Sequence, residues 1–216
     1  MRLNWGVTAV RAGQLEVAHQ QLAHLRRIEP DSTRPLLLQA FILEERGEYP
    51  AALRCYGRTV SQVSPENPAE LAYSYEMAMD FYTRRKLRVR CERLLKRAYL
   101  ANACTVELCE AYREFTGPLI EHGYWFNIML EFDYRGGLCE VYERPLEREP
   151  GLRRFQRSYQ VIARDRDEAI VLVTDFAARM GETGQTVCEF VREEALDAVH
   201  AGLYEVEREC LVLESA

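Results

Sequence analysis

The sequence predicts an α+β protein in two parts: helical hairpins over residues 1–120 and a small antiparallel sheet over residues 121–216. Three observations lead to this prediction. In the first part, apolar residues recur at three- and four-residue spacing, and matching residues stand 34 positions apart. In the second, apolar and polar residues alternate, and aromatic and β-branched residues are frequent. The charge also changes, because residues 1–122 hold 17 Lys+Arg against 15 Asp+Glu, which leaves 11 of the 28 and 19 of the 34 for the remainder.

Two stretches of the first part repeat one pattern, about residues 4–30 and 34–65. The small residues Gly6 and Ala40 would let the two helices of a hairpin approach closely. Gly13 and Gly47 stand where the first helix of each pair should end, because glycine readily adopts a positive φ. The remaining matches are Ala9 with Leu43, Ala18 with Ala52, and Leu22 with Tyr56, and Pro30 and Pro65 close the units.

A third, weaker unit is expected 38 residues further on, with Ala78 at the position of Ala40. The turn formers of residues 64–68 would absorb the change in spacing. Arg85 stands at the position of the turn glycine, which leaves the corner of this hairpin open. A helix over about residues 106–115 would cap the stack.

These residues and their period resemble the tetratricopeptide repeat, a unit of two antiparallel helices in about 34 residues. The resemblance implies a stack of hairpins whose first helices form a concave surface that binds a peptide or another protein. An ordinary helical bundle remains the alternative to this stack. Within the stack, Tyr75 and Tyr82 could instead pack between hairpins. The residues expected on the concave surface are Asn4, Thr8, Arg11, Gln39, Glu45, Tyr75, Met79 and Tyr82.

Residues 84–97 form a basic segment with eight Lys+Arg and one acid, Glu92. Helical spacing places four of the basic residues on one face, which is typical of a solvated helix. Such a face would also suit an acidic protein, including the acidic second part of this chain. The net charge of −6 argues against nucleic acid as the main partner, and the helix lacks the apolar depth for a membrane surface. The four basic residues are Lys86, Arg90, Arg93 and Arg97.

The second part predicts the order βββαββ. The first three strands are expected at about residues 124–134, 138–142 and 155–163, and the third carries Phe155, Arg157, Tyr159 and Val161 on one face. Asp165 and Glu168 predict a capping box for a helix that ends at Gly181. Strands at about residues 186–192 and 203–213 follow, with a short helix at 195–201 between them.

The sequence carries no recognisable catalytic, metal or cofactor motif. Its four histidines lack ligand spacing, and its seven cysteines include no C-x-x-C pair, so reduced structural thiols are expected. The acids Asp165, Asp167 and Glu168 are explained by the start of a helix. We therefore expect no bound metal, no cofactor and no enzyme.

The leading functional hypothesis is a non-enzymatic protein-binding module: an adaptor, a chaperone-like protein or a regulatory factor. An enzyme or ligand sensor with its site in the second part is the alternative. A third hypothesis is a homo-oligomer in which Trp125 and Phe126 pair between subunits. No apolar run reaches the roughly 20 residues that span a bilayer, and no secretory leader is evident, so a cytoplasmic protein is expected.

Overall fold

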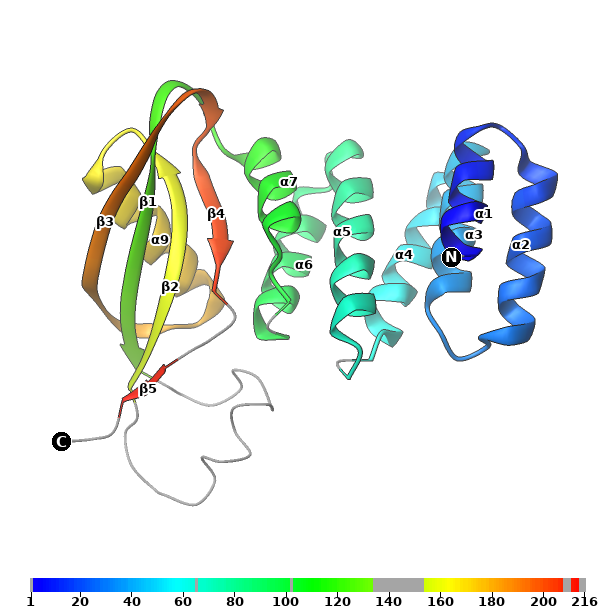
Figure 1. Ribbon diagram of the computed structural model, residues 1–216, viewed down its shortest axis with the longest axis horizontal. Coiled ribbons are helices and arrows are strands. Elements are labelled where there is room, and N and C mark those ends of the chain that lie inside the picture. The colour runs from blue at the N-terminus through cyan, green and yellow to red at the C-terminus, as the bar shows by residue number, and fades with distance from the viewer. Residues whose placement is uncertain (1, 65, 102, 134–153, 208–210, 214–216) are drawn as a thin grey trace. The chain divides into compact units, whose positions relative to one another are not determined.

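The computed structural model describes residues 2–64, 66–101, 103–133, 154–207 and 211–213. Helices precede an antiparallel sheet, which confirms the predicted α+β class (Figure 1). The contacts divide the chain into two compact units, Met1–Ala78 and Met79–Ala216. This division falls inside a helix about forty residues before the expected boundary near residue 120, because the two helices that precede the sheet pack with it.

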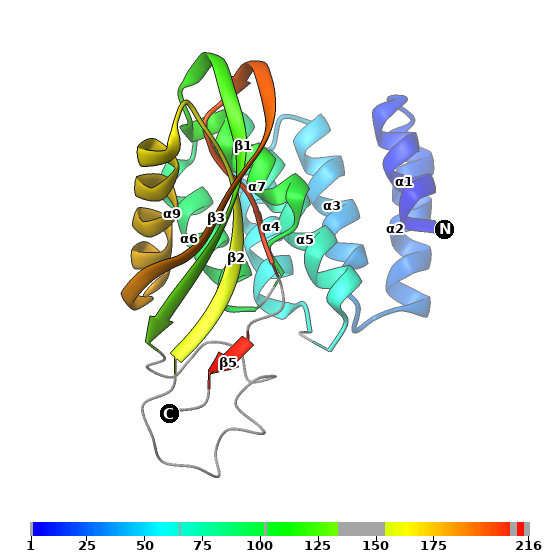
Figure 2. The same cartoon turned by 60° about the vertical axis from the view of Figure 1, so that its left-hand side comes forward.

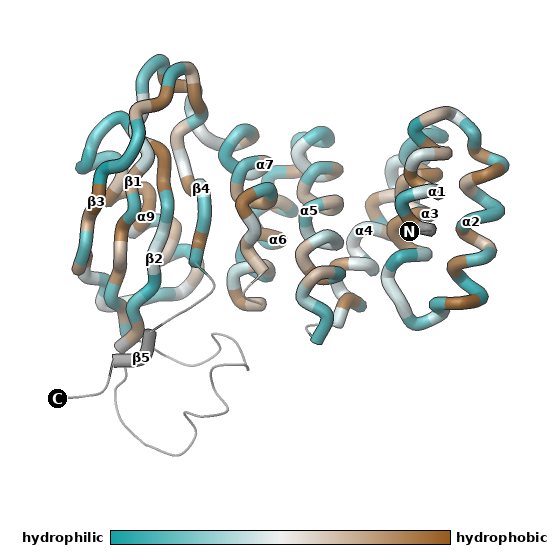
Figure 3. The backbone as a smooth tube through the Cα atoms, viewed as in Figure 1, coloured by the Kyte–Doolittle hydropathy of each residue, from teal (hydrophilic) through white to brown (hydrophobic). Residues whose placement is uncertain are grey.

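The first unit is built from four helices and the beginning of a fifth. They are α1 (Arg2–Arg11), α2 (Leu15–Ile28), α3 (Arg34–Glu45), α4 (Tyr49–Gln62) and α5 (Pro68–Arg84), of which α5 continues into the second unit. The first helix packs against α2 and α3, and α3 packs against α2 and α4. Hydrophobic and hydrophilic residues mix along each helix, as expected where one stripe is buried (Figure 3).

Gly6 serves a close contact, although not the one expected within a hairpin. A Cβ atom at this position would lie 2.5 Å from Cδ2 of Leu38, so the glycine of α1 makes room for a leucine of α3. The close approach therefore joins the first helices of consecutive hairpins.

The helix corners repeat one backbone motif. At the corners between α1 and α2, between α3 and α4, and before the helix that follows α5, the residues with positive φ are Gly13 (69°), Gly47 (75°) and Lys86 (55°). In each case the next amide donates to the carbonyl five residues earlier, at 2.8 Å for Gln14 to Ala9, 2.8 Å for Glu48 to Leu43 and 2.9 Å for Leu87 to Tyr82. This is the hydrogen bond of a Schellman motif. The third corner is thus formed, and Lys86 rather than Arg85 takes the left-handed position.

The left-handed residues of the second and third corners, Gly47 and Lys86, lie 39 residues apart rather than the expected 38. With this spacing, Cys91 matches Ala52 and Ala18, and all three side chains are fully buried. Leu95 likewise matches Tyr56, and both are buried. The buried face of the helix after the corner is therefore repeated, although its residue types differ.

The second unit combines two helices with a sheet and a covering helix. Its elements after α5 are α6 (Arg88–Leu100), α7 (Val106–Thr116), β1 (Leu119–Asp133), β2 (Arg154–Ala163), α9 (Arg166–Met180), β3 (Thr183–His200), β4 (Gly202–Val206) and β5 (Leu211–Leu213). The strand order is β3-β1-β2-β4, with β5 paired to β2, and all pairs are antiparallel. The strand expected at 138–142 lies outside the described residues.

The prediction of a short helix at 195–201 is wrong, because residues 195–200 form the last part of strand β3. Ala195, Leu196 and Asp197 pair with β1, and this long-range pairing overrides their local helical preference. Asp165 caps α9 as expected, since its side chain accepts from the amide of Glu168 at 2.9 Å.

One face of the sheet is buried under α9, which contacts strands β1 to β4 (Figure 2). The predicted face of β2 is confirmed as part of this core. Phe126, expected as an intersubunit contact, is also buried here, and Trp125 packs against Tyr204 with ring centroids 5.0 Å apart. The buried cross-strand pairs are Phe126 with Val161, Ile128 with Tyr159, Leu130 with Arg157, and Phe132 with Phe155.

Helices α6 and α7 belong to the same core. Helix α7 packs against β4, and α6 packs against α7 and α9. Within the ranges that the structure describes, no helix is long and apolar enough to cross a bilayer.

Lys86→Gly should stabilise the protein, because glycine removes the cost of a left-handed conformation at a side-chain-bearing residue. The gain in unfolding free energy should be about 0.5–1 kcal/mol after the extra flexibility of the unfolded chain is counted. Gly47→Ala is the matched opposite and should lose about 1 kcal/mol, since a Cβ there meets no other atom and only φ is unfavourable. Denaturant unfolding measures both, and equal stability of Lys86→Gly and wild type would contradict the argument.

Candidate functional site

The residues predicted for a concave surface separate into two groups. Asn4, Thr8, Arg11 and Glu45 are exposed, and Gln39 is half-buried and accepts a hydrogen bond from Arg26 at 2.9 Å. Tyr75, Met79 and Tyr82 are buried, so their assignment to a binding surface is wrong. Their large apolar surfaces fill the interior around α5, which is the alternative that the sequence left open for the tyrosines.

The basic residues of α6 are at the surface. Arg90, Arg93 and Arg97 are exposed and follow one another at helical spacing, and we call these three the arginine row. Lys86 does not belong to it, because this residue lies in the corner before the helix begins. Burial raises the pKa of Tyr82, and the positive charge of the nearby Arg90 acts in the opposite direction.

The arginine row differs from its basic neighbours in its ion pairing. Arg84 pairs with Asp80 at 2.8 Å, and Arg88 pairs with Glu92 at 3.2 Å. Arg93 and Arg97 form no ion pair with any residue that the structure describes. Two guanidinium groups are therefore left to solvent on this face of α6.

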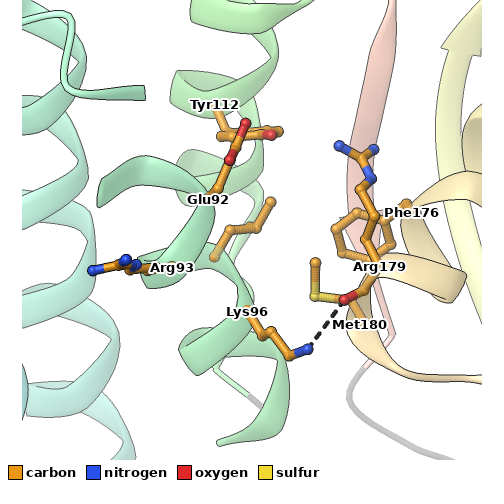
Figure 4. A pocket seen from close by; sticks show the side chains of 8 residues that line it. Glu92, Arg93, Lys96, Tyr112, Phe176, Arg179 and Met180 are labelled. Carbon is orange, nitrogen blue, oxygen red and sulfur yellow. Dashed lines mark hydrogen bonds between the residues drawn. The ribbon is translucent and has the colours of Figure 1, made fainter. Parts of the chain in front are cut away.

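A pocket of about 250 Å³ opens beside the arginine row, between α6, α7 and α9 (Figure 4). Its floor is apolar and buried, and its rim is polar. The floor consists of Leu95, Phe176 and Met180, and the rim of Glu92, Arg93, Lys96, Tyr112 and Arg179.

The rim of the pocket is positively charged. Arg93, Lys96 and Arg179 are exposed, whereas the one acid, Glu92, is engaged by Arg88. Lys96 Nζ donates to the main-chain carbonyl of Arg179 at 3.2 Å, which places a cation at the negative end of α9 (Figure 4).

Tyr112 closes one side of the rim. Burial raises the pKa of the Tyr112 hydroxyl, and the positive charge of the nearby Arg179 acts in the opposite direction. The hydroxyl therefore stays neutral at physiological pH, and Arg179 is held instead by the hydrogen bond from its Nε to the main-chain carbonyl of Asp175 at 3.1 Å.

A buried polar chain lies behind the floor. The hydroxyls of Tyr99 and Tyr159 are 3.2 Å apart, and the Tyr159 hydroxyl donates to Glu182 Oε1 at 2.6 Å. Phe176 packs edge-on against both tyrosine rings, with centroids 5.8 and 6.2 Å away. Phe176 thus contacts both the pocket and the rings of the polar chain. Arg157 completes this region, because its guanidinium lies over the Tyr99 ring at 4.7 Å.

Glu182 is the most perturbed carboxyl of this region. It is 2% exposed, and burial raises its pKa to about 8. Its Oε2 has no hydrogen-bond partner among the described residues. The side chain is therefore protonated at neutral pH. The sequence offered no signal for this residue, because its burial results from contacts with distant strands and not from a local motif.

The chemistry of the pocket favours binding. Its lining contains no histidine, cysteine, serine or threonine, and Glu182 is not part of it. A ligand in the pocket would therefore meet an apolar floor and a cationic rim, without a nucleophile and its base.

A second, more polar pocket of about 440 Å³ lies in the first unit, and Gln39 is among its lining residues. Most of its lining is exposed, and Pro35 is the only buried residue in it. Nearby, Glu70 accepts from the backbone of Thr33 and the hydroxyl of Ser32, each at 2.9 Å, and so holds the α2–α3 connection to α5. Burial raises the pKa of Glu70, but the hydrogen bonds from Thr33 and Ser32 outweigh this effect and leave the pKa below its usual value.

Glu182→Gln should make stability less dependent on pH. The folded protein retains a proton that the unfolded chain releases above its usual pKa of 4.5, so the stability of the wild type falls as the pH rises from about 4.5 to about 8. The loss is at most about 1.4 kcal/mol per pH unit over that window. Denaturant unfolding at pH 5, 6.5 and 8 should show a smaller decline for Glu182→Gln. The exposed Glu189→Gln is the control, and parallel curves for Glu182→Gln and wild type would contradict a buried, protonated Glu182.

Among the described cysteines, Cys188 should react first with an alkylating reagent. It is exposed, whereas Cys55, Cys91, Cys104 and Cys109 are buried. Burial raises the pKa of Cys91 to about 11, and a hydrogen bond with Cys104 together with burial raises that of Cys109. Brief iodoacetamide treatment at pH 8 followed by peptide mass spectrometry should modify Cys188 well before the other four. Modification of Cys91 or Cys109 at the rate of Cys188 would show that the core is open.

Comparison with known proteins was negative at every level. No family model matches the chain, and no curated protein or solved structure does so either.

Proposed function

We propose that the chain is a non-enzymatic protein-binding module, an adaptor, chaperone-like or regulatory factor, that binds an acidic protein or peptide. The observation that carries this proposal is the arginine row, where Arg93 and Arg97 are exposed without an acidic partner among the described residues while Arg84 and Arg88 are paired.

The arginine row is unfavourable for the isolated chain. Arg93 and Arg97 are four residues apart on one helix, and like charges at this spacing destabilise a helix by roughly 0.2–0.5 kcal/mol. Carboxylates of a partner would remove this repulsion and form bidentate hydrogen bonds with the guanidinium groups. The acidic second part of the chain supplies no such carboxylate from its described residues.

The helical corners support a tetratricopeptide-like interpretation of the first part. Gly13, Gly47 and Lys86 repeat one hydrogen-bonded corner, and the helices that follow repeat their buried positions. Repeated helical hairpins are a common scaffold for protein binding. In the first unit, the exposed Asn4, Thr8, Arg11 and Glu45 remain available for such a contact.

An enzyme or ligand sensor is the second candidate, and it draws on one observation. Glu182 is a protonated carboxyl close to a pocket, which is a property of general acids. This carboxyl is buried and does not line the pocket, so proton transfer to a ligand would require movement of the side chains that cover it. The geometry thus supports binding better than catalysis.

Reversing charge in the arginine row should weaken partner binding at least about tenfold, because each lost Arg–carboxylate contact is replaced by repulsion. The test compares wild type, Arg93→Glu/Arg97→Glu and the control Arg54→Glu/Arg58→Glu, which makes the same charge change at exposed residues of α4. Each protein is used to recover partners from the native host, with quantitative mass spectrometry at two salt concentrations.

The expected result is a specific protein that wild type and control retain at low salt, that the Arg93→Glu/Arg97→Glu variant loses, and that elutes at high salt. Equal recovery by all three forms would show that the arginine row does not contribute to binding.

A further inference from the structure

The pocket between α6, α7 and α9 is continuous with the arginine row, because Arg93 belongs to both. One helix face therefore presents an apolar cavity and exposed cations side by side. An acidic segment that contacts the row would pass the mouth of the cavity.

The size of the pocket restricts what can fill it. Its volume of about 250 Å³ lies below the roughly 300–1,000 Å³ of sites that enclose a whole drug-sized ligand. A cavity of this size instead suits one large side chain of a peptide, the kind of anchor that provides much of the binding energy at protein interfaces.

The floor is held in place before any ligand arrives. Phe176 is packed between the rings of Tyr99 and Tyr159, and Leu95 is 1% exposed. Met180, at 8% exposure, is the flexible member, and methionine adapts readily to differently shaped apolar groups. The floor is therefore largely preformed, which lowers the entropic cost of binding.

The rim selects for negative charge next to the apolar group. Lys96 and Arg179 lie at the mouth, Arg93 belongs to the same wall with its side chain extending away from α9 (Figure 4), and the salt bridge from Arg88 occupies Glu92. Lys96 and Arg179 are already oriented, the first by the main-chain carbonyl of Arg179 and the second by a hydrogen bond from its Nε to the main-chain carbonyl of Asp175 at 3.1 Å. Carboxylates on both sides of an inserted side chain would each meet a cation.

We propose that this pocket binds a single large apolar side chain, such as Leu, Met or Phe, from an acidic peptide segment of the partner, while flanking carboxylates contact Arg93, Lys96 and Arg179. The inference rests on the proposed function and specifies its partner: an acidic segment with one apolar anchor. The charge complementarity of the rim and the one-side-chain volume of the cavity together carry it.

Fluorescence anisotropy with the full chain and three labelled nine-residue peptides tests the proposal. The first peptide has a central Leu between acidic residues, the second replaces that Leu by Ala, and the third keeps Leu between serines. The first should bind about tenfold or more tightly than either of the others. The Ala peptide loses the burial of a leucine side chain, which is worth a tenfold to hundredfold change in affinity. The serine peptide loses the carboxylates that contact the cationic rim.

Two protein variants locate the binding. Met180→Trp should fill the pocket and remove the preference for Leu over Ala, whereas Val171→Trp makes a similar change at an exposed residue of α9 and should retain it. Arg93→Glu changes an exposed residue and should weaken both acidic peptides, so a folding defect in Met180→Trp would not leave the proposal without a test.

The outcomes separate the two proposals. Equal affinity of the Leu and Ala peptides, with loss of both in Arg93→Glu, would overturn the anchor pocket and leave the acidic partner standing. No binding of any acidic peptide, or no effect of Arg93→Glu, would overturn both. If dodecanoate displaces the labelled Leu peptide at a lower concentration than the unlabelled Leu peptide does, the occupant is a small anionic amphiphile. That result would overturn the proposal that a peptide side chain fills the pocket.

Discussion

The packing of Phe176 against Tyr99 and Tyr159 is the contact on which the rest of the second unit depends. It joins α9 to α6 and to the sheet, and the polar chain to Glu182 lies directly behind it. Because α6 is held in this way, its outer face carries the arginine row next to the pocket mouth. Edge-on aromatic packing of this kind is directional as well as apolar, so it fixes orientation along with distance.

The same contact explains why the core contains a neutral carboxyl. The Tyr99 and Tyr159 hydroxyls are buried and need hydrogen-bond partners, and Glu182 provides the last acceptor of the chain. No cation is among the causes of its raised pKa, so desolvation dominates and keeps the proton on the carboxyl. A polar chain of this kind stabilises one arrangement of α6, β2 and the residues after α9, because any other would leave buried hydroxyls unsatisfied.

The two kinds of arginine on α6 and its neighbours show how charge is divided between stability and recognition. Arg84 and Arg88 lie four residues from an acid and form local pairs that support their helices. Arg93 and Arg97 lack an acid at that spacing, and Arg93 borders an apolar cavity. Exposed charge beside an apolar floor is the arrangement found where a polar rim surrounds an apolar anchor.

The sequence by itself determined the features that depend on neighbours in the chain. The corners at Gly13 and Gly47, the cap at Asp165 and the buried face of β2 follow from residue type and spacing, because each is a local backbone or alternation rule. Tertiary structure alone decided that α6 and α7 join the sheet unit, that Tyr75 and Tyr82 are buried, and that residues 195–200 continue a strand. Tertiary structure also created the pocket and buried Glu182. The pocket brings together residues about 80 positions apart in the chain, such as Lys96 and Arg179, and no local sequence pattern encodes such a contact.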